Sequence, residues 1–413
     1  MRDEPMRFLF YSHDGLGLGH TRRHLGVAAA LAQQAPEAVI LLATGAEEIA
    51  RHGLPPQVEI LKLPSLRKDA NQSYSSRRLG VSAAEIRSLR SALLLTAVKT
   101  FQPTVVLVDK HPFGASGEFK AGLKALRRLG GRAVLGLRDI LDEPRQVLRE
   151  WRPYKMQQRI AAHYDEVVIY GDRAVFDPVI AYAFPPSLVE RTRFCGYVLS
   201  RESDRALENF EWPFPPREQR TRPVVLATTG GGEDGFRMLE TFIRAAARAP
   251  WQGVAVAGPM TPDRELASLE KLAAENGVTF RNFVPHLSAL FGSLDALVCM
   301  GGYNTLVEAT ALGVPTVCVP RVTPRTEQLI RAEAFARLGL LRVCRPDQLD
   351  PHTLGDHIAV ALKSSPQDLT ARAHRALNYD GAQQAAKRLL NLATKSVAAA
   401  QRKTANPQLL TAH

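Results

Sequence analysis

The sequence predicts an α/β protein built from two doubly wound, Rossmann-like domains. Short apolar runs typical of strands buried on both faces, such as residues 7–12 and 297–299, alternate with helical segments along the 413 residues. A glycine-rich turn follows the first strand of each half, at residues 13–20 and 229–235. A proline-rich, charged stretch at residues 200–222 separates the halves and is the expected linker.

These observations set the expected domain boundaries. We expect an N-terminal domain over residues 1–199 and a C-terminal domain over residues 223–380, joined by the linker. Residues 381–413 should form a last helix, with its amphipathic part at 382–394, followed by a frayed tail.

The composition excludes several classes of protein. No run of about 18 apolar residues could span a membrane, and residues 1–12 carry acids and enter a strand at once, unlike a signal peptide. The four cysteines lack metal-ligand spacing, which fits a reducing cytoplasm. The net charge is +12, and the basic residues are dispersed along the chain. No aromatic residues interleave with them, so we expect no nucleic-acid partner. A basic solvated surface is the simplest explanation, and attraction to a phosphorylated substrate or an anionic membrane is the alternative.

The first glycine-rich turn, residues 13–20 (HDGLGLGH), precedes a helix expected over 21–34 and a strand over 39–44. NAD binding is disfavoured because His20 replaces the third glycine of G-x-G-x-x-G and no acid ends the second strand. His24 lies one helical turn after His20, but no third metal ligand is evident, so we expect no metal site. This turn follows the carboxyl end of a strand, where ligands bind in such folds, so His20 is a candidate for a binding cleft. The further candidates in the turn are His13, Gly15, Gly17 and Gly19.

A strand over residues 54–63 should lead into a long, polar and basic loop at 65–80. Loops of this length inside a domain are often functional, so this one could close over an acceptor or contact an anionic membrane. A plain surface loop is the alternative. A helix is expected over residues 82–100.

Charged residues follow two later strands, at residues 104–109 and 132–137. The carboxyl ends of parallel strands share one edge of a sheet, so these residues should line the same cleft as His20. They are Asp109, His111, Arg138 and Asp139. An acceptor site and a hinge contact both fit this pattern, and Asp139 and Asp142 could instead cap the following helix. Strands at 165–170 and 194–198 should complete the sheet.

The C-terminal half contains the most informative stretch, residues 296–331. A buried strand ends in Gly301 and Gly302, and a helix that ends near Gly313 follows. A helix N-terminus at the carboxyl end of a parallel strand suits a phosphate. Glu308, one turn into the helix, could accept hydrogen bonds from a ribose diol, or could be a solvated first-turn residue.

Three motifs carry a resemblance to a known family. GGYNTLVEA at residues 301–309, VPTVCVP at 314–320 and TEQLIRAEAF at 326–335 resemble the donor-binding half of the MurG-like, family 28 glycosyltransferases. GLGHTRR at residues 17–23 resembles the first loop of these enzymes and of PseG-type nucleotide-sugar hydrolases. The resemblance implies a GT-B architecture, in which two Rossmann-like domains face each other across a cleft and the last helix returns to the first domain.

The resemblance also implies roles for individual residues. His20 would take the proton from the nucleophile, as a positioned imidazole can near neutral pH. Where the family usually shows two glutamines against the donor sugar, this chain has Glu327 and Gln328, so the donor sugar stays open. The implied donor-binding residues are Gly230, Gly231, Gly232, Phe283, Val284, Gly301, Gly302, Tyr303, Asn304, Thr305, Glu308, Glu327 and Gln328.

The function expected from these features is transfer of a sugar from a nucleotide-sugar, with a UDP-sugar as the expected donor, to an unidentified hydroxyl acceptor with inversion. No D-x-D motif stands at a strand end, so we expect metal-independent chemistry and no cofactor beyond the nucleotide-sugar substrate. A PseG-type hydrolase, a 2-epimerase and a non-catalytic nucleotide-sugar-binding protein are the alternatives. We expect a cytoplasmic protein, with peripheral contact at the inner membrane face as an option; the sequence does not specify the oligomeric state.

Overall fold

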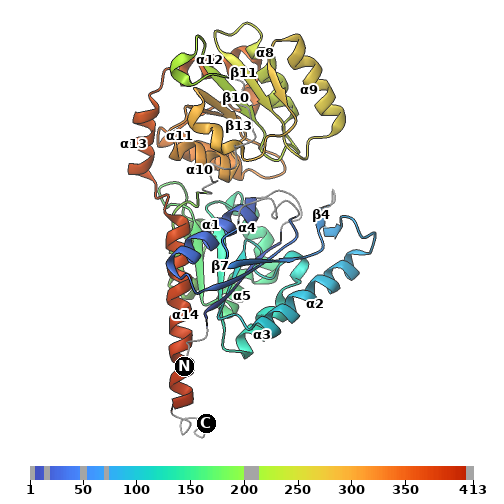
Figure 1. Cartoon of the computed structure of the whole chain (residues 1–413), viewed down its shortest axis with the longest axis vertical. Helices are drawn as coiled ribbons and strands as arrows, with labels where there is room; N and C mark the ends of the chain where they lie inside the picture. The colour runs from blue at the N-terminus through green and yellow to red at the C-terminus, as the bar shows by residue number, and fades with distance from the viewer. Residues whose placement is uncertain (1–4, 14–18, 47–53, 69–73, 200–213, 406–413) are drawn as a thin grey trace.

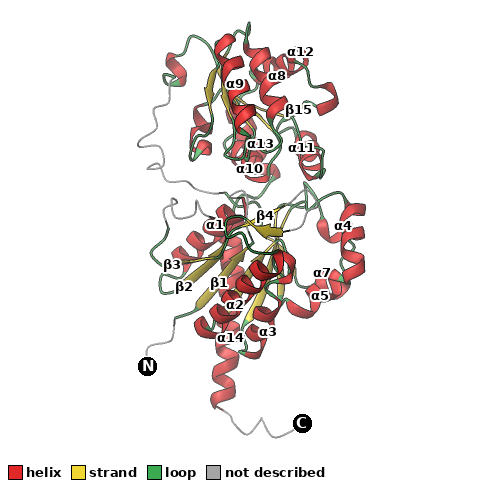
Figure 2. Cartoon of the chain, turned by 90° about the vertical axis from the view of Figure 1, so that its right-hand side faces the viewer, coloured by secondary structure: helices red, strands yellow, loops and turns green. Residues whose placement is uncertain are grey.

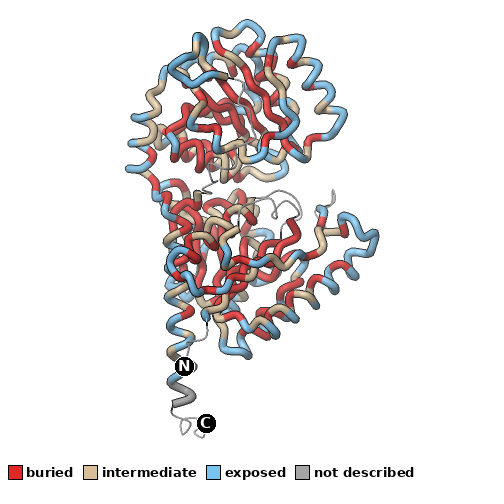
Figure 3. Tube along the Cα trace, viewed as in Figure 1, coloured by how far each residue is buried: buried red, intermediate tan, exposed pale blue. Residues whose placement is uncertain are grey.

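The computed structural model describes residues 5–13, 19–46, 54–68, 74–199 and 214–405 of the chain. It has two lobes, one above the other in Figure 1, each built around its own parallel sheet. We call the lower one the N-terminal lobe and the upper one the C-terminal lobe. Each sheet is the centre of a buried core, shown in red in Figure 3.

The N-terminal lobe contains a seven-stranded sheet in the order β3-β2-β1-β6-β7-β8-β9, with all neighbouring strands parallel. The strands are β1 (Arg7–Ser12), β2 (Val39–Thr44), β3 (Val58–Lys62), β6 (Val105–Asp109), β7 (Arg132–Arg138), β8 (Glu166–Tyr170) and β9 (Thr192–Phe194). Because the chain leaves β1 toward β2 and later returns to β6 on its other side, the strand order reverses between β1 and β6. Ligands bind at such a switch point in open α/β sheets.

Alternating side chains of β1 divide the N-terminal core into two layers. Phe8 and Phe10 pack on the face covered by α1 (Gly19–Gln34), while Leu9 and Tyr11 pack on the opposite face. The other helices of this lobe are α2 (Ala83–Phe101), α3 (Lys120–Arg128), α4 (Pro144–Trp151), α5 (Met156–His163), α6 (Pro178–Ala181) and α7 (Pro186–Val189). α2 begins at a capping box in which Ser82 and Glu85 each bond the other's backbone N–H.

The C-terminal lobe repeats this arrangement with a six-stranded parallel sheet in the order β12-β11-β10-β13-β14-β15. Its strands are β10 (Val224–Thr228), β11 (Gln252–Val256), β12 (Thr279–Arg281), β13 (Ala296–Cys299), β14 (Thr316–Cys318) and β15 (Arg342–Val343). Its helices are α8 (Phe236–Ala246), α9 (Asp263–Glu275), α10 (Tyr303–Ala311), α11 (Glu327–Arg337), α12 (Pro351–Ala361) and α13 (Pro366–Ala376). The switch point of this sheet lies between β10 and β13, so the predicted doubly wound α/β fold is confirmed.

The last helix, α14 (Gly381–Ala405), leaves the C-terminal lobe after α13 and runs along the N-terminal lobe (Figures 1 and 2). Leu389 and Ala393 of α14 belong to the same apolar cluster as Val27 and Leu31 of α1. Arg388 donates two hydrogen bonds, of 2.6 and 2.7 Å, to the Glu166 carboxylate on β8. The chain therefore covers its first sheet with its last helix, which extends beyond the expected amphipathic part at 382–394.

Several elements differ from expectation. The strand expected over residues 54–63 is β3, which spans only Val58–Lys62. The prediction of an unstructured loop at 65–80 is wrong, because β4 (Leu66–Lys68) and β5 (Tyr74–Ser76) pair antiparallel within it. Strands of three residues are too short to show alternation, and a buried contact of Leu66 with α2 stabilises the hairpin. Residues 69–73 lie outside the described residues.

The last strand of the N-terminal sheet is also displaced from the expected 194–198 to Thr192–Phe194. Gly196 has a φ of +89° and a Cβ placed on it would lie 2.7 Å from Asn378 O, so the chain turns against the start of α14 rather than continuing the sheet. None of the helices among the described residues is long and apolar enough to cross a membrane.

Candidate active site

The two switch points face each other across the contact between the lobes. Arg22 of α1 donates a 2.8 Å hydrogen bond from Nη2 to Glu308 Oε1 on α10, although 286 residues separate them. A Cβ placed on Gly19 would lie 3.8 Å from Asn304 Nδ2. The N-termini of α1 and α10 therefore meet, and the first turn of α1, with His20, adjoins the GGYNTLVEA segment.

His20 is held by a buried carboxylate at the end of the neighbouring strand. Its Nδ1 lies 2.8 Å from Oδ2 of Asp109, the last residue of β6. The Asp109 side chain is fully buried, whereas that of His20 is 15% exposed. In the tautomer with the proton on Nδ1, the ring donates to Asp109 and leaves Nε2 as a proton acceptor.

Arg23 contacts both members of this pair. Its Nη2 lies 2.6 Å from the same Asp109 Oδ2 and 2.8 Å from His20 Nδ1. Burial alone would raise the pKa of Asp109, but the charges of Arg23 and His20 outweigh it and hold that pKa well below its usual range. Asp109 therefore stays ionised, and its negative charge stabilises a protonated His20.

A second group of aromatic and imidazole side chains lies beside His20. The ring of His13 is 5.0 Å from that of His20 and 4.2 Å, edge to face, from that of His111. The hydroxyl of Tyr74 on β5 is 3.5 Å from His111 Nε2. Burial, together with the charges of His111 and His20, lowers the pKa of His13 well below its ordinary value. The predicted cleft residues His13, Asp109 and His111 are thus brought together with His20, while Gly15 and Gly17 lie outside the described residues.

The buried imidazole of His24, near Asp109, Arg23 and His20, should make the stability of the protein depend on pH. Burial lowers its pKa from 6.5 to about 4, with Asp109 opposing the shift and Arg23 and His20 adding to it. Above pH 6.5 both folded and unfolded chains carry a neutral imidazole, and below it the unfolded chain binds the proton first. We therefore expect the free energy of unfolding to fall by roughly 3 kcal/mol between about pH 6.5 and pH 4 from this residue.

Urea denaturation at pH 7.5 and pH 5 measures this effect, with His24→Leu as the comparison. The variant should lose less stability than the wild type over the same interval. Equal losses in both proteins would show that His24 does not take part.

The second glycine-rich turn is packed closely against the loop that follows β11. Gly230 and Gly232 have φ of +68° and +93°, and a Cβ on Gly232 would lie 2.7 Å from Gly258 Cα. A Cβ on Gly231 would lie 2.6 Å from Met260 Cε. Positive φ therefore favours glycine at Gly230 and Gly232, and the close approach of the Gly258 backbone excludes a side chain at Gly232. The turn also leads from β10 toward α8 at the switch point, where the family resemblance implies donor binding by Gly230, Gly231 and Gly232.

Gly301 and Gly302 form the turn from β13 into α10. Gly301 has a φ of +86°, and a Cβ there would lie 3.2 Å from Gln328 O. Gly302 caps α10, in which Glu308 is 6% exposed. Tyr303 is buried between the lobes, and its hydroxyl accepts a hydrogen bond from Val198 N. Asn304 and Thr305 follow it in the first turn of α10.

Arg321 organises the opposite edge of the C-terminal site. Its Nη2 donates to Glu327 Oε1 at 2.7 Å, and its Nη1 donates to Asp234 of the glycine-rich turn at 3.1 Å. Its backbone N–H donates to Gln328 Oε1 at 3.3 Å. The predicted sugar-binding pair, Glu327 and Gln328, is therefore held by one arginine that follows β14.

Asp139 and Asp142 make contacts between the lobes. Asp139 accepts two hydrogen bonds of 2.8 Å from Arg331 of α11, and both side chains are fully buried. Asp142 accepts from Arg325 Nη1 at 3.0 Å and from Thr326 N at 2.9 Å. The helix-cap interpretation of these residues is wrong, because Glu143 caps α4. Of the two alternatives for Asp139, the structure supports the hinge contact.

Two of the implied donor-binding residues, Phe283 and Val284, differ in exposure. Phe283 is 47% exposed, whereas Val284 is buried. No pattern in the sequence indicates the roles of Arg22, Arg321 and Arg331, since arginines at these positions look like ordinary solvated helix or loop residues. Among the described residues, no group of three or more His, Cys, Asp or Glu side chains is arranged to hold a metal ion.

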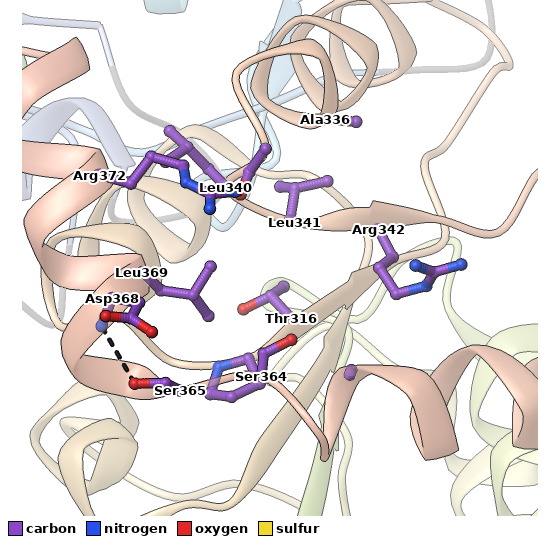
Figure 4. A pocket seen from close by; sticks show the side chains of 13 residues that line it. Thr316, Ala336, Leu340, Leu341, Arg342, Ser364, Ser365, Asp368, Leu369 and Arg372 are labelled. Atoms are coloured by element: carbon purple, nitrogen blue, oxygen red, sulfur yellow. Dashed lines mark hydrogen bonds between the residues drawn. The ribbon is translucent and has the colours of Figure 1, made fainter.

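A pocket of about 410 Å³ lies elsewhere, between α11, β15 and the α12–α13 junction (Figure 4). Thr316 and Arg342, which begin β14 and β15, line it. It therefore lies at the amino-terminal edge of the sheet, whereas ligands bind at the carboxyl-terminal edge. None of the predicted site residues lines this pocket.

Comparisons with known proteins agree with this geometry. Residues 231–389 match the glycosyltransferase family 28 C-terminal domain. The chain is 24% identical, over 54% of its length and 62% of the relative's, to the UDP-N-acetylglucosamine–N-acetylmuramyl-(pentapeptide) pyrophosphoryl-undecaprenol N-acetylglucosamine transferase of Streptomyces coelicolor. It is 23% identical to the enzyme of the same name from Limosilactobacillus fermentum, over 84% of the chain and 87% of that relative.

A solved structure shows the same architecture. The crystal structure of Acinetobacter baumannii MurG superposes with a TM-score of 0.57 and 15% identity, covering 94% of this chain and all of that one (100%). The family match lies in the lobe that carries Gly230, Gly302 and Glu308, and the fold match extends over both lobes. Residues 231–389 therefore match the family 28 C-terminal domain, and over both lobes the chain resembles the MurG-like glycosyltransferases of GT-B architecture.

Proposed function

We propose that the protein transfers a sugar from a nucleotide-sugar donor, with a UDP-sugar as the expected donor, to a hydroxyl acceptor with inversion at the anomeric carbon. The observation that carries this proposal is the position of the His20–Asp109 pair. It stands at the first switch point and adjoins, through Arg22 and Glu308, the donor motif at the second. The relatives' names, which include a UDP-N-acetylglucosamine donor, support this choice of nucleotide.

In this mechanism Asp109 orients His20 and stabilises its protonated form. His20 Nδ1–H donates to Asp109, and Nε2 removes the proton from the acceptor hydroxyl as its oxygen attacks the anomeric carbon. The bond from that carbon to the diphosphate oxygen breaks, and the nucleoside diphosphate leaves with the electron pair. The imidazolium is stabilised by the buried, ionised Asp109.

The leaving diphosphate needs compensating charge. We assign this role to the backbone N–H groups of Gly230 to Gly232 and to the N-terminus of α10 at Gly302, because both end at the C-terminal switch point. Metal independence and the lack of a resident cofactor stay part of this proposal.

A calorimetric screen of UDP-, GDP- and dTDP-sugars tests the proposal, followed by mass analysis of the products with and without candidate acceptors. Binding of a nucleotide-sugar, and release of nucleotide that depends on an acceptor, would support transfer. Equal release with donor alone would identify a hydrolase, and binding without release a non-catalytic binding protein.

Glu308→Gln is expected to weaken nucleotide-sugar binding by about 10- to 100-fold. The substitution removes the charge that would strengthen hydrogen bonds from the ribose hydroxyls, each worth roughly 1.5–3 kcal/mol. Titration calorimetry measures the change. Glu333→Gln on the exposed part of α11 is the matched control, since Glu333 pairs with Arg345 at the surface. Equal affinities of Glu308→Gln and wild type would remove Glu308 from the donor site.

The acceptor belongs to the same proposal. The curated relatives act on a lipid-linked acceptor, as their names state. The basic residues Arg67 and Lys68 of β4 lie in the hairpin next to Tyr74, on the side of the cleft with His20. A cytoplasmic protein whose hairpin contacts anionic lipid fits these features, and co-sedimentation with phosphatidylglycerol vesicles tests it.

A further inference from the structure

Arginine side chains are concentrated where the two lobes meet, and most are matched by a carboxylate. The matched ones are Arg22 with Glu308, Arg23 with Asp109, Arg321 with Glu327, Arg325 with Asp142 and Arg331 with Asp139, at 2.6–3.0 Å. Within each pair the two charges neutralise each other, so these arginines leave little net charge for a substrate.

Arg138 differs from all of them. It is the last residue of β7, in the middle of the N-terminal sheet (Figure 1), and its side chain is only partly exposed. Its Nε is buried without a hydrogen-bond partner, and among the described residues its guanidinium makes no ion pair. A partly buried cation without a partner is costly, so its presence at the carboxyl edge of a central strand needs an explanation.

The surroundings of Arg138 increase this cost. Burial lowers its pKa, and so do the charges of Arg331 and Arg23, while Glu327 and Asp139 act in the opposite sense. Both carboxylates already accept from other arginines, at 2.7 and 2.8 Å. Neither carboxylate is therefore available as the ion-pair partner of Arg138.

The unpaired oxygen of Glu327 indicates which part of the substrate approaches Arg138. Its Oε1 accepts from Arg321, but its Oε2 is buried and has no partner. Glu327 is 4% exposed and is one of the residues expected against the donor sugar. The buried Oε2 of Glu327 on one lobe and the buried Nε of Arg138 on the other thus lack partners, and the two side chains are close enough for their charges to interact. A hydroxyl and an anionic group of one ligand would satisfy both.

We propose that Arg138 is a specificity-determining residue that binds an anionic group of the substrate, opposite Glu327, at the sugar end of the donor. The proposal rests on the proposed function. A carboxylate on the transferred sugar, as in a hexuronic acid, is one source of this anion, and the donor diphosphate is the other. Guanidinium binds both in the same bidentate manner.

Titration calorimetry with UDP, UDP-glucose and UDP-glucuronate distinguishes the sources, using the wild type, Arg138→Gln and Arg138→Lys. If the sugar carries the anion, Arg138→Gln should weaken UDP-glucuronate by about 10- to 100-fold and leave UDP and UDP-glucose within about threefold. If the diphosphate is the anion, all three ligands should weaken by the same factor. Arg138→Lys should retain part of the affinity in either case.

Arg132→Gln is the matched control, since Arg132 begins the same strand and pairs with Asp165 at the far edge of the sheet. Unchanged binding of all three ligands by Arg138→Gln, while Glu308→Gln weakens them, would overturn the proposal and leave the proposed function intact. Failure of the wild type to bind any of them would instead count against the UDP-sugar function.

The melting temperature of the ligand-free protein gives a second test that needs no nucleotide. Because Arg138 is an unpaired cation among like charges, Arg138→Gln should raise Tm, whereas Arg132→Gln should lower it slightly. A lower Tm for Arg138→Gln would show that the guanidinium already has its partners within the fold, and would overturn the proposal.

Discussion

Replacing His20 with alanine is expected to lower turnover by roughly 10²- to 10⁴-fold while leaving the affinity for the nucleotide-sugar nearly unchanged. The imidazole contacts Asp109 in the N-terminal lobe, whereas the residues assigned to the donor lie in the C-terminal lobe. Loss of the base should therefore affect the chemical step rather than donor binding. Initial rates and donor titration, measured on the same preparation, separate these effects.

His352→Ala is the matched control for this substitution, because the side chain of His352 is 88% exposed on α12, far from the cleft. Asp109→Asn offers a second comparison. The amide can still contact His20 but carries no negative charge, so turnover should fall in that variant as well. Full turnover by His20→Ala with donor binding intact would remove His20 as the base.

Replacing Asp139 with alanine is expected to destabilise the protein by about 3–5 kcal/mol. The substitution leaves the Arg331 guanidinium buried without its carboxylate, and uncompensated buried charges have costs of this size. Because Arg331 Nη1 also donates to Gly301 O at 3.1 Å, the donor turn should lose order in the same variant. Equilibrium denaturation measures the first effect, and donor titration measures the second.

The exposed pair of Arg345 and Glu333 serves as the control, because its side chains are 51% and 38% exposed. Glu333→Ala should cost less than about 1 kcal/mol. A double variant that replaces both Asp139 and Arg331 with apolar residues should recover part of the lost stability. Similar losses for Asp139→Ala and Glu333→Ala would show that the buried pair does not hold the lobes together.

The sequence was sufficient for the fold because buried parallel strands are continuous apolar runs. Residues 104–109, TVVLVD, contain β6 almost to the residue. The three-residue strands of the β4–β5 hairpin could not be found in this way, since their pairing depends on contacts with α2. Local pattern thus predicts the elements that make up a sheet, and fails for those that depend on tertiary packing.

The candidate site was predictable where it rests on short motifs and not where it rests on contacts between distant residues. His20 and Glu308 stand in recognisable turns, whereas the partner of His20 is 89 residues away and that of Glu308 is 286 residues away. Arg331 looks like a solvent-facing helix residue in RAEAFAR, yet its side chain is fully buried. Pairing of charges across the lobes leaves no periodic trace in the sequence.

The course of the last helix has a consequence for synthesis on the ribosome. The apolar side chains of α1 leave the ribosome before both sheets are made, but Leu389 and Ala393, which cover them, emerge only after both lobes have been synthesised. Until then the apolar side chains of α1 form an uncovered hydrophobic stripe on the nascent N-terminal lobe. A chain truncated before Gly381 would keep that stripe permanently and should be found with chaperones or in aggregates.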